Sequence, residues 1–281
     1  MDLEKQLELT LNRHLTKNDG QTPPNLAEAI RYSLLAPGKR IRPRILLACA
    51  QMLGLQEGQA LPAALALEMI HCFTLIHDDL PCMDDDDFRR GRPSCHKKFD
   101  EALALLAGDA LIPLAIDVFM DSAVDPLRLL AGLKHFTWAS GPRGVVGGQA
   151  AESLLKQDSP FEEMIQMHAQ KTGALFSAAL LVPMEFAGIA PESEKGQAIQ
   201  NFAATLGLAF QAADDLEDAT SESTNDPTHV LHYRKSNDVV NETVRNLTQV
   251  SHQLTQLWQD SAQPLTHIAD EVIRKIEVAQ K

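Results

Sequence analysis

The chain is poor in aromatic residues and in cysteine, and it has almost no strand-type sequence. Phe, Trp and Tyr make up 5% of its 281 residues, and there are four cysteines. Runs of β-branched and aromatic residues that alternate with polar ones are nearly absent, which disfavours a β-rich fold. The cysteines (Cys49, Cys72, Cys82 and Cys95) show no C-x-x-C or Cys/His spacing, so we expect reduced thiols and no zinc site.

Positive charge is also scarce. The chain has 25 Lys and Arg against 38 Asp and Glu, a formal net charge of −13. Such an excess disfavours binding to nucleic acid or to an acidic membrane surface. It does not exclude anionic substrates, because local basic clusters or bound metal ions can reverse the charge at one site.

Long apolar runs and a secretion signal are missing as well. No continuous apolar run reaches the roughly 18 residues that a membrane span requires. The opening segment MDLEKQLELTLNRHL is amphipathic but charged throughout, unlike a secretory signal. We therefore expect a cytoplasmic protein without a membrane span.

What the chain does have is helical periodicity in Leu- and Ala-rich segments, with 44% hydrophobic residues overall. Helices are predicted over 3–15, 25–35, 43–53, from Pro62 to about 79, and over 100–120, 126–138, 160–182, 193–218, 239–258 and 264–280. The polar segment 219–238 is predicted to be a loop with one short helical turn. No Pro/Gly/Ser-rich linker divides the chain, so we predict one all-α domain over 1–281 with about ten or more helices.

The most informative segment is HDDLPCMDDDDFRRGR, residues 77–92, with six aspartates and three arginines. Carboxylates this close repel one another unless a cation neutralises them. Mg²⁺ commonly bridges such carboxylates to phosphate groups, and guanidinium groups bind phosphate directly. The segment therefore indicates a metal-dependent phosphate site, with a solvated acidic loop as the alternative. Pro81 leaves open whether Asp84 folds back beside Asp78.

A second acidic group strengthens this interpretation. Asp214, Asp215 and Asp218 end another apolar helix, and they lie within about 100° of each other on its surface. Two such groups, each at the end of a long apolar helix, indicate carboxylates that face each other across a cavity mouth.

These residues resemble the trans-isoprenyl diphosphate synthases, most closely the bacterial farnesyl diphosphate synthases, over roughly residues 25–220. The first family motif matches Asp78-Asp79-LPCM-Asp84 with Arg89-Arg90, and the second matches Phe210-Gln211 with Asp214-Asp215-Leu216-Glu217-Asp218. The resemblance implies an all-α bundle around a central cavity, of the isoprenoid synthase type, and a homodimer.

The resemblance also implies roles for the matching residues. Lys39 and Arg42 of the segment GKRIRP would bind isopentenyl diphosphate, together with His71 and Arg90. Arg89 and Lys171 would bind the allylic diphosphate, either dimethylallyl or geranyl diphosphate. The catalytic set would be Asp78, Asp79, Asp84, Lys171, Thr172, Gln211 and Asp214. Gln211 is also expected to contact substrate.

The implied cofactor is Mg²⁺, with three ions between the two acidic motifs. The ligands would be Asp78, Asp79, Asp84, Asp214, Asp215 and Asp218. The implied reaction is departure of pyrophosphate from the allylic substrate, followed by 1′-4 condensation with isopentenyl diphosphate to form farnesyl diphosphate. Phe73, five residues before the first aspartate, would limit product length. Thr74 lies more directly below Asp78 on an ideal helix, so the floor of the tunnel is left open between these two residues, and C10 or C20 products remain alternatives.

The chain departs from the family after the second motif. The segment TSESTNDPTHVLHYRKSND is about ten residues shorter than usual and lacks the expected lysines, for which Arg234 or Lys235 could substitute. Glu217 replaces an apolar residue, and Glu152 replaces an aspartate. A weakly active or inactive homologue that serves as a regulatory subunit is therefore a second hypothesis, and a terpene cyclase is a third.

Overall fold

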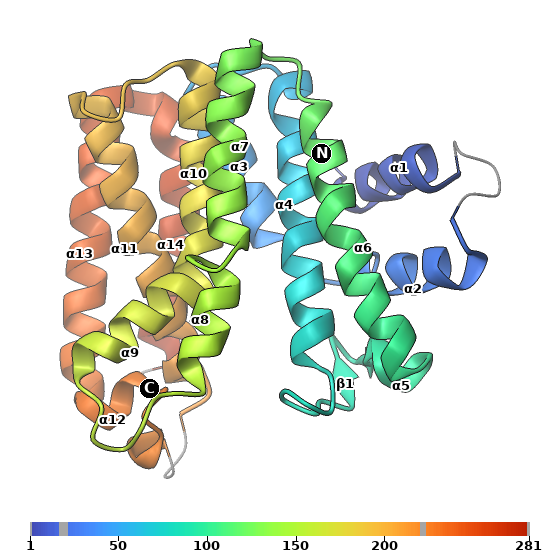
Figure 1. Cartoon of the computed structure of the whole chain (residues 1–281). Coiled ribbons are helices and arrows are strands. Elements are labelled where there is room, and N and C mark those ends of the chain that lie inside the picture. Colours follow the sequence, from blue (N-terminus) through green and yellow to red (C-terminus); the bar gives the residue numbers. More distant parts are fainter. Residues whose placement is uncertain (1, 17–21, 220–222, 280–281) are drawn as a thin grey trace. The chain divides into compact units, whose positions relative to one another are not determined.

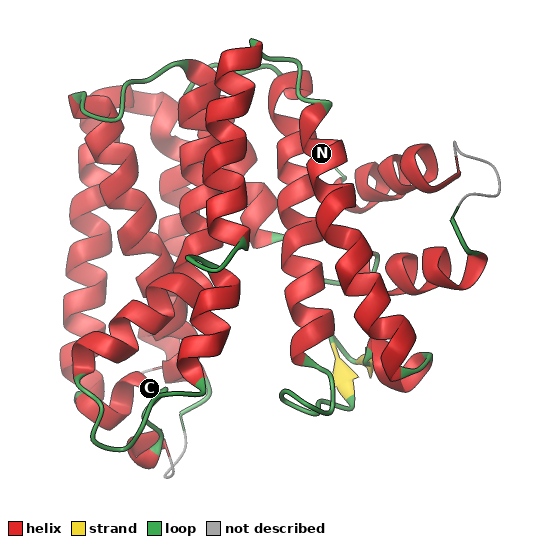
Figure 2. Ribbon diagram, in the orientation of Figure 1, coloured by secondary structure: helices red, strands yellow, loops and turns green. Residues whose placement is uncertain are grey.

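The fold is all-α. The computed structural model describes residues 2–16, 22–219 and 223–279, and in these ranges nearly all regular structure is helical (Figure 2). The two strands found there are β1 (Phe88–Arg89) and β2 (Arg92–Pro93), which form a short antiparallel hairpin. The chain divides into two compact units, which are described separately. Unit 1 comprises residues 1–44 and 57–123, and unit 2 comprises residues 45–56 and 124–281.

Unit 1 is organised around two long helices. It contains α1 (Leu3–Thr16), α2 (Pro24–Leu34), α4 (Glu57–Asp78), α5 (Cys95–Lys98) and α6 (Glu101–Met120), with the first turn of α3 (Ile41–Met52). Helices α4 and α6 pack along each other over most of their length (Figure 1). Gly108 permits this close approach, because a Cβ atom there would lie 2.1 Å from Nε2 of His77.

Helix α4 begins five residues earlier than the sequence pattern predicts. The pattern makes Pro62 the opening residue, but Pro62 lies inside the helix. A proline inside a helix leaves the carbonyl four residues earlier without a partner. Here that carbonyl, of Gly58, accepts a hydrogen bond from the backbone N–H of Ala123 at 3.0 Å. A contact distant in sequence therefore compensates for Pro62, and local pattern could not reveal it.

Two helices are long and apolar enough to span a membrane by length and composition alone. They are α4, with mean hydropathy 1.5, and α6, with mean hydropathy 2.0. About 67% of the apolar window of α4 is buried inside the protein, as in a core helix. Only 39% of the corresponding window of α6 is buried.

Unit 2 holds the rest of α3, from Ile45 onward, and the remaining helices. They are α7 (Pro126–Ser140), α8 (Val145–Glu152), α9 (Phe161–His168), α10 (Ala174–Ala187), α11 (Glu194–Glu217), α12 (Val230–Tyr233), α13 (Ser236–Trp258) and α14 (Gln263–Ala279). Short 3₁₀ turns occupy Ser223–Asn225 and Gln259–Ala262, and a π-helical turn, η1 (Ala169–Gly173), joins α9 to α10. Helix α11 packs against α10, α13 and α14. Its buried small and apolar residues therefore form the centre of this unit.

Most predicted helices are confirmed, including the short turn, α12, inside the polar segment after the second acidic motif. The predicted helix over 160–182 is interrupted by η1, and α8, α5 and the hairpin lie in segments for which no element is predicted. Residues 220–222 of the loop and residue 280 of the last helix lie outside the described ranges. The cysteines are confirmed as free thiols, with Cys82 exposed and the other three buried. The single domain and its central cavity stay predictions.

Candidate active site

The first acidic motif is a tight turn at the end of α4. The backbone N–H of Asp84 donates to the carbonyl of Asp78 at 2.9 Å, and that of Met83 donates to Leu80 at 2.9 Å. The chain after Pro81 therefore returns to the end of α4, and the backbone of Asp84 folds back beside that of Asp78. The backbone positions of Asp78 and Asp84 lie together, and the Asp84 side chain is exposed.

Asp79 differs from its neighbours because it is buried and already paired. It is 2% exposed, and Nε of Arg89 donates to its Oδ1 atom at 2.7 Å. Burial raises the pKa of Asp79, and the bond to Arg89 offsets part of this effect. Arg89 also forms an ion pair with Asp86. Arg89 thus neutralises carboxylates of the motif, in addition to its predicted role toward substrate.

His71 lies among three arginines of unit 1, Arg40, Arg42 and Arg90, which form a cationic cluster. Nη1 of Arg42 donates to Nε2 of His71 at 3.1 Å, so this ring nitrogen acts as an acceptor. Burial, and then the guanidinium of Arg42, lower the pKa of His71 well below its usual value. His71 is therefore neutral at pH 7, which is the state that can accept the bond from Arg42. Lys39 is exposed.

A buried glutamate that sequence reasoning missed supports this cluster. Glu68 is 1% exposed on α4 and accepts a hydrogen bond from Arg40 at 2.5 Å, and Arg90 approaches it at 3.5 Å. Arg40 also donates to the backbone carbonyls of Leu34 and Ala36. A single acidic residue within the apolar sequence ALALEMIHC was the signal that could have revealed Glu68. It fixes Arg40, and it holds Arg90 beside the residues predicted to bind diphosphate.

In unit 2, Lys171 and Thr172 lie in the π-helical turn η1, an irregularity that often occurs at functional sites. Lys171 forms an ion pair with Glu152 of α8, and Gln149 donates to the same carboxylate at 3.2 Å. Glu152, a departure from the family pattern, therefore orients both side chains. Small residues allow the close packing, since a Cβ atom on Gly148 would lie 2.2 Å from the backbone nitrogen of Lys171.

A chain of hydrogen bonds joins this turn to the second acidic motif. The Thr172 hydroxyl donates to Oε1 of Gln211 at 2.6 Å, and Nε2 of Gln211 donates to Asp215 at 2.7 Å. The other carboxylate oxygen of Asp215 accepts from the backbone N–H of Val230 at 2.9 Å. Asp215 is buried, and both of its oxygens bind within the protein. It anchors α12, in the shortened segment, to α11.

Asp214 lies in the last turn of α11, and Asp218 caps the end of this helix. Asp214 forms an ion pair with Lys275 of α14. Burial raises the pKa of Asp214, although Lys275 acts in the opposite direction. Lys275 also contacts Glu217 at 2.7 Å. Arg234, one proposed substitute for the missing lysines, instead pairs with Glu242 at 2.6 Å. No sequence pattern connects Lys275 with Asp214, because 61 residues separate them along the chain.

The two predicted chain-length residues have different environments. Phe73 is 4% exposed, and its ring lies edge-on to His77 with 5.8 Å between ring centroids. The hydroxyl of Thr74 donates to the carbonyl of His71 at 2.8 Å. Thr74 is thus tied to its own helix, whereas Phe73 presents a bulky buried ring.

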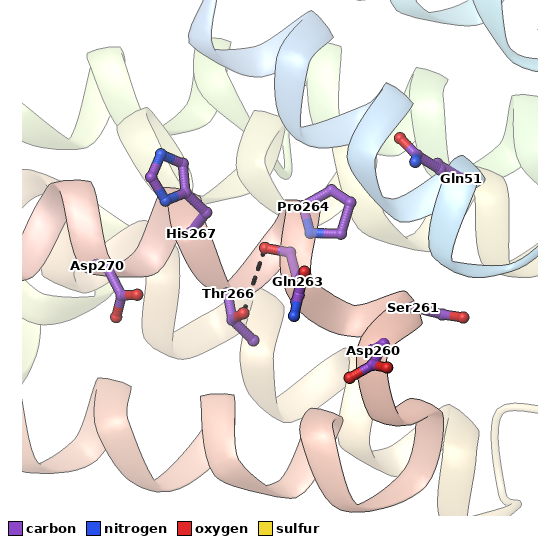
Figure 3. Close-up of a pocket in the computed structure, with 8 residues that line it drawn as sticks. All are labelled: Gln51, Asp260, Ser261, Gln263, Pro264, Thr266, His267 and Asp270. Atoms are coloured by element: carbon purple, nitrogen blue, oxygen red, sulfur yellow. Dashed lines mark hydrogen bonds between the residues drawn. The ribbon is translucent and has the colours of Figure 1, made fainter.

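A groove of about 610 Å³ in unit 2 contains no predicted site residue. Its polar side chains point in different directions and do not converge on one position (Figure 3). The lining residues are Gln51, Asp260, Ser261, Gln263, Pro264, Thr266, His267 and Asp270. This arrangement does not suggest a reaction centre.

A sequence model of the polyprenyl synthetase family matches residues 23–259, which include both acidic motifs and the cationic cluster. The chain belongs to the polyprenyl synthetase family. This membership confirms the family resemblance and the all-α isoprenoid synthase fold.

Within the polyprenyl synthetase family, the chain is similar to synthases with different named products. It is 43% identical over 206 residues to geranylgeranyl pyrophosphate synthase 7 of Arabidopsis thaliana, which covers 72% of this chain and 59% of the relative. It is 39% identical over 219 residues to the farnesyl diphosphate synthase of Geobacillus stearothermophilus, which covers 76% of this chain and 72% of the relative. The chain spans about three-fifths of the length of the first of these curated relatives.

Solved structures of family members agree over almost the whole chain. A geranyltransferase from Legionella pneumophila superposes with a TM-score of 0.87 at 30% identity, covering 98% of this chain and 95% of the other. An FPP/GFPP synthase from Zymomonas mobilis gives a TM-score of 0.80 at 31% identity, covering 96% and 98%.

The two acidic motifs of the chain have the oxygen donors that Mg²⁺ prefers. Asp78 with Asp84, and Asp214 with Asp218, lie at helix ends where carboxylates could meet a cation. Within 2–16, 22–219 and 223–279, however, no three His, Cys, Asp or Glu residues form a preassembled metal group. Asp79 and Asp215 would have to give up internal hydrogen bonds to bind metal, so their assignment as ligands stays a prediction.

Proposed function

We propose that this chain is a short-chain trans-prenyltransferase that condenses isopentenyl diphosphate with dimethylallyl or geranyl diphosphate, with farnesyl diphosphate as the product. The observation that carries the proposal is the cationic cluster of unit 1, in which Arg42 bonds to neutral His71 while Glu68 holds Arg90 and Arg40. An enzyme that acts on an allylic diphosphate alone does not need such a second diphosphate site. Both acidic motifs, which would serve the allylic substrate, retain all their aspartates.

Two sets of cationic side chains are proposed to bind the two diphosphate groups. Lys39, Arg42 and Arg90 bind the diphosphate of the isopentenyl substrate, and neutral His71 keeps Arg42 in position. Arg89 and Lys171 bind the allylic diphosphate, and each is held beforehand by carboxylates, of Asp79 and Glu152 respectively. Pre-positioned cations reduce the cost of ordering side chains when substrate binds.

The remaining roles concern the leaving group and the reacting carbon. Mg²⁺, when bound to carboxylates of the two motifs, supplies Lewis-acid stabilisation of the departing pyrophosphate. Thr172 and Gln211 are locked to each other by a 2.6 Å hydrogen bond, so the polar surface of η1 keeps one orientation. Water would quench a developing allylic cation, so the proposed reaction requires apolar residues that exclude water from the reacting carbon.

Product length is proposed to depend on Phe73. Its ring is buried and packs against His77, so it is a firm obstacle to chain growth below the first motif. The relatives include both geranylgeranyl and farnesyl diphosphate synthases, so C20 is the competing product. Replacing Phe73 by Ala should lengthen the main product by at least one C5 unit, whereas Thr74→Ala should change it less.

One assay tests the activity. Purified protein is incubated with Mg²⁺, labelled isopentenyl diphosphate, and either dimethylallyl or geranyl diphosphate, and the dephosphorylated products are sized. We expect the C15 product from both primers. The Asp78→Ala variant should give no product although it folds as the wild type does. No elongation with either primer would refute the proposal and favour the regulatory-subunit hypothesis. Conversion of an allylic diphosphate without isopentenyl diphosphate, to a cyclic hydrocarbon, would favour the cyclase hypothesis.

Assembly and cellular location belong to the same proposal. We propose a homodimer, on the basis of the family resemblance, and a cytoplasmic location.

A further inference from the structure

The ammonium group of Lys275 is paired with carboxylates of the second acidic motif. Lys275 forms ion pairs with Asp214 and with Glu217, three residues apart on α11. Its ammonium group also lies 5.6 Å from the centroid of the Phe210 ring, which favours a cation at this point. Three groups of one helix therefore surround one ammonium group from another helix.

The amphipathic pattern of α14 places Lys275 there. Leu265, Ile268, Val272 and Ile276 are buried and follow one face of the helix, which packs on α11 and α13. Lys275 is adjacent to Ile276 at the edge of this face, and its side chain is 23% exposed. Its methylene groups can thus lie along the packed surface while the ammonium group reaches the end of α11.

Glu217 adds a second carboxylate to the contact between Lys275 and Asp214. An apolar residue at this position would leave Lys275 with Asp214 alone, whereas Glu217 provides a second carboxylate at 2.7 Å. Asp214 is then neutralised without any metal ion. A divalent cation that binds Asp214 through Oδ1 must displace Lys275, because this oxygen already accepts from the ammonium group. Glu217 then provides a second carboxylate for the displaced ammonium group.

We propose that Lys275 is a positioning residue that sets the affinity of the second acidic motif for divalent cations, with Glu217 as its tether. The proposal rests on the function proposed above, because that function gives the motif a cation to bind. Lys275 acts through Asp214 and not on the substrate. It lowers the cation affinity of this motif, so that metal binds there mainly when a diphosphate arrives with it.

The test measures cation binding directly. Mn²⁺ is titrated into the full chain, without substrate, and the loss of the free Mn²⁺ signal is followed by electron paramagnetic resonance. Lys275→Met should bind Mn²⁺ about three- to tenfold more tightly, because a positive charge next to the carboxylates is removed. Lys275→Arg should stay within about twofold of wild type, because its charge is retained.

Two controls locate the effect. Arg274→Met removes the same charge from an exposed position one residue earlier, and its affinity should stay within about twofold of wild type because solvent screens it. Asp214→Asn, added to Lys275→Met, should abolish the gain. Circular dichroism and thermal melting establish that each variant is folded, and Lys275→Gln replaces Lys275→Met if the latter is not.

The proposal is overturned if Lys275→Met binds Mn²⁺ no more tightly than wild type, if Arg274→Met gives the same gain, or if the gain survives Asp214→Asn. These outcomes do not depend on turnover. A wild-type chain that transfers no prenyl group would refute the proposed function, while the Mn²⁺ titrations would still decide the role of Lys275.

Discussion

At the scale of single residues, the neighbours Lys39 and Arg40 in the segment GKRIRP have opposite environments. Arg40 is 5% exposed and adopts a positive φ of 48°, and its guanidinium is bonded to Glu68 and to two backbone carbonyls. Lys39 beside it is exposed. The pattern of charges in the sequence does not distinguish them, because only burial and partners separate a structural cation from a substrate-binding one.

Removing the charge of Arg40 should therefore affect the stability of the fold, whereas removing the charge of Lys39 should affect substrate binding. Arg40→Met leaves Glu68 buried with only the longer contact to Arg90, and it should lower the free energy of unfolding by about 3 kcal/mol. Lys39→Met should change it by less than about 0.5 kcal/mol but raise the KM for isopentenyl diphosphate. Urea unfolding followed by circular dichroism, together with initial rates, checks both. Equal destabilisation by the two variants would contradict this division of roles.

His71 makes stability depend on pH in a known direction. Burial and Arg42 lower its pKa in the folded state below the usual value of 6.5, so at lower pH the unfolded chain binds a proton that the folded chain does not. Stability from this residue is therefore complete above pH 6.5 and is lost as the pH falls below it, by up to about 1.4 kcal/mol per pH unit.

The variant His71→Gln should flatten this dependence, because glutamine can still accept a bond from Arg42 but does not titrate. Unfolding free energies at pH 7, 6 and 5, from urea denaturation, check the prediction. His267→Gln, at an exposed position on α14, is the matched control and should leave the slope unchanged. A wild-type slope that persists in His71→Gln would place the pH dependence elsewhere.

At the scale of helices and turns, the sequence predicts what local periodicity controls. The apolar repeat of α13, with Val240, Leu247 and Leu254 seven residues apart, marks a buried face that the sequence pattern alone reveals. The turn η1 is different, because Lys171 and Thr172 lie within an ordinary helical pattern that gives no sign of a π-helical turn. The structure of η1 depends on contacts with α8 and α11, which come from distant parts of the sequence.

The contact between Gly148 of α8 and the backbone of η1 can be tested by substitution. Gly148→Ala would place a methyl group 2.2 Å from the backbone nitrogen of Lys171, where no flexible side chain can move aside. We expect a loss of about 1–3 kcal/mol in unfolding free energy and a fall in kcat, because η1 must shift together with Lys171 and Thr172.

Gly58→Ala on α4 is the control for this prediction, since a Cβ atom there meets nothing within 4 Å. It should stabilise the protein by up to about 1 kcal/mol and leave kcat unchanged. Thermal unfolding and steady-state rates compare the two variants. A Gly148→Ala variant with wild-type stability and kcat would show that η1 tolerates displacement.

At the scale of the whole molecule, the outer face of α6 needs an explanation. Leu105, Leu106 and Met120 are 46%, 53% and 51% exposed on a helix whose apolar window is only 39% buried. Single exposed apolar residues are common, but a helix with mean hydropathy 2.0 and this exposure has the composition of an interface. We infer that a second copy of the chain covers this face of α6 in the proposed homodimer.

A charge on this face should therefore dissociate the dimer. We expect the wild-type chain to sediment at twice its 30.8 kDa mass without detergent, and Leu106→Asp to sediment as a monomer. Leu154→Asp, at an apolar position 74% exposed in unit 2, is the control and should remain dimeric. Sedimentation velocity at several concentrations measures both. A monomeric wild type that needs detergent to stay in solution would mean that the α6 face meets lipid, and equal dissociation of both variants would mean that α6 has no special part in assembly.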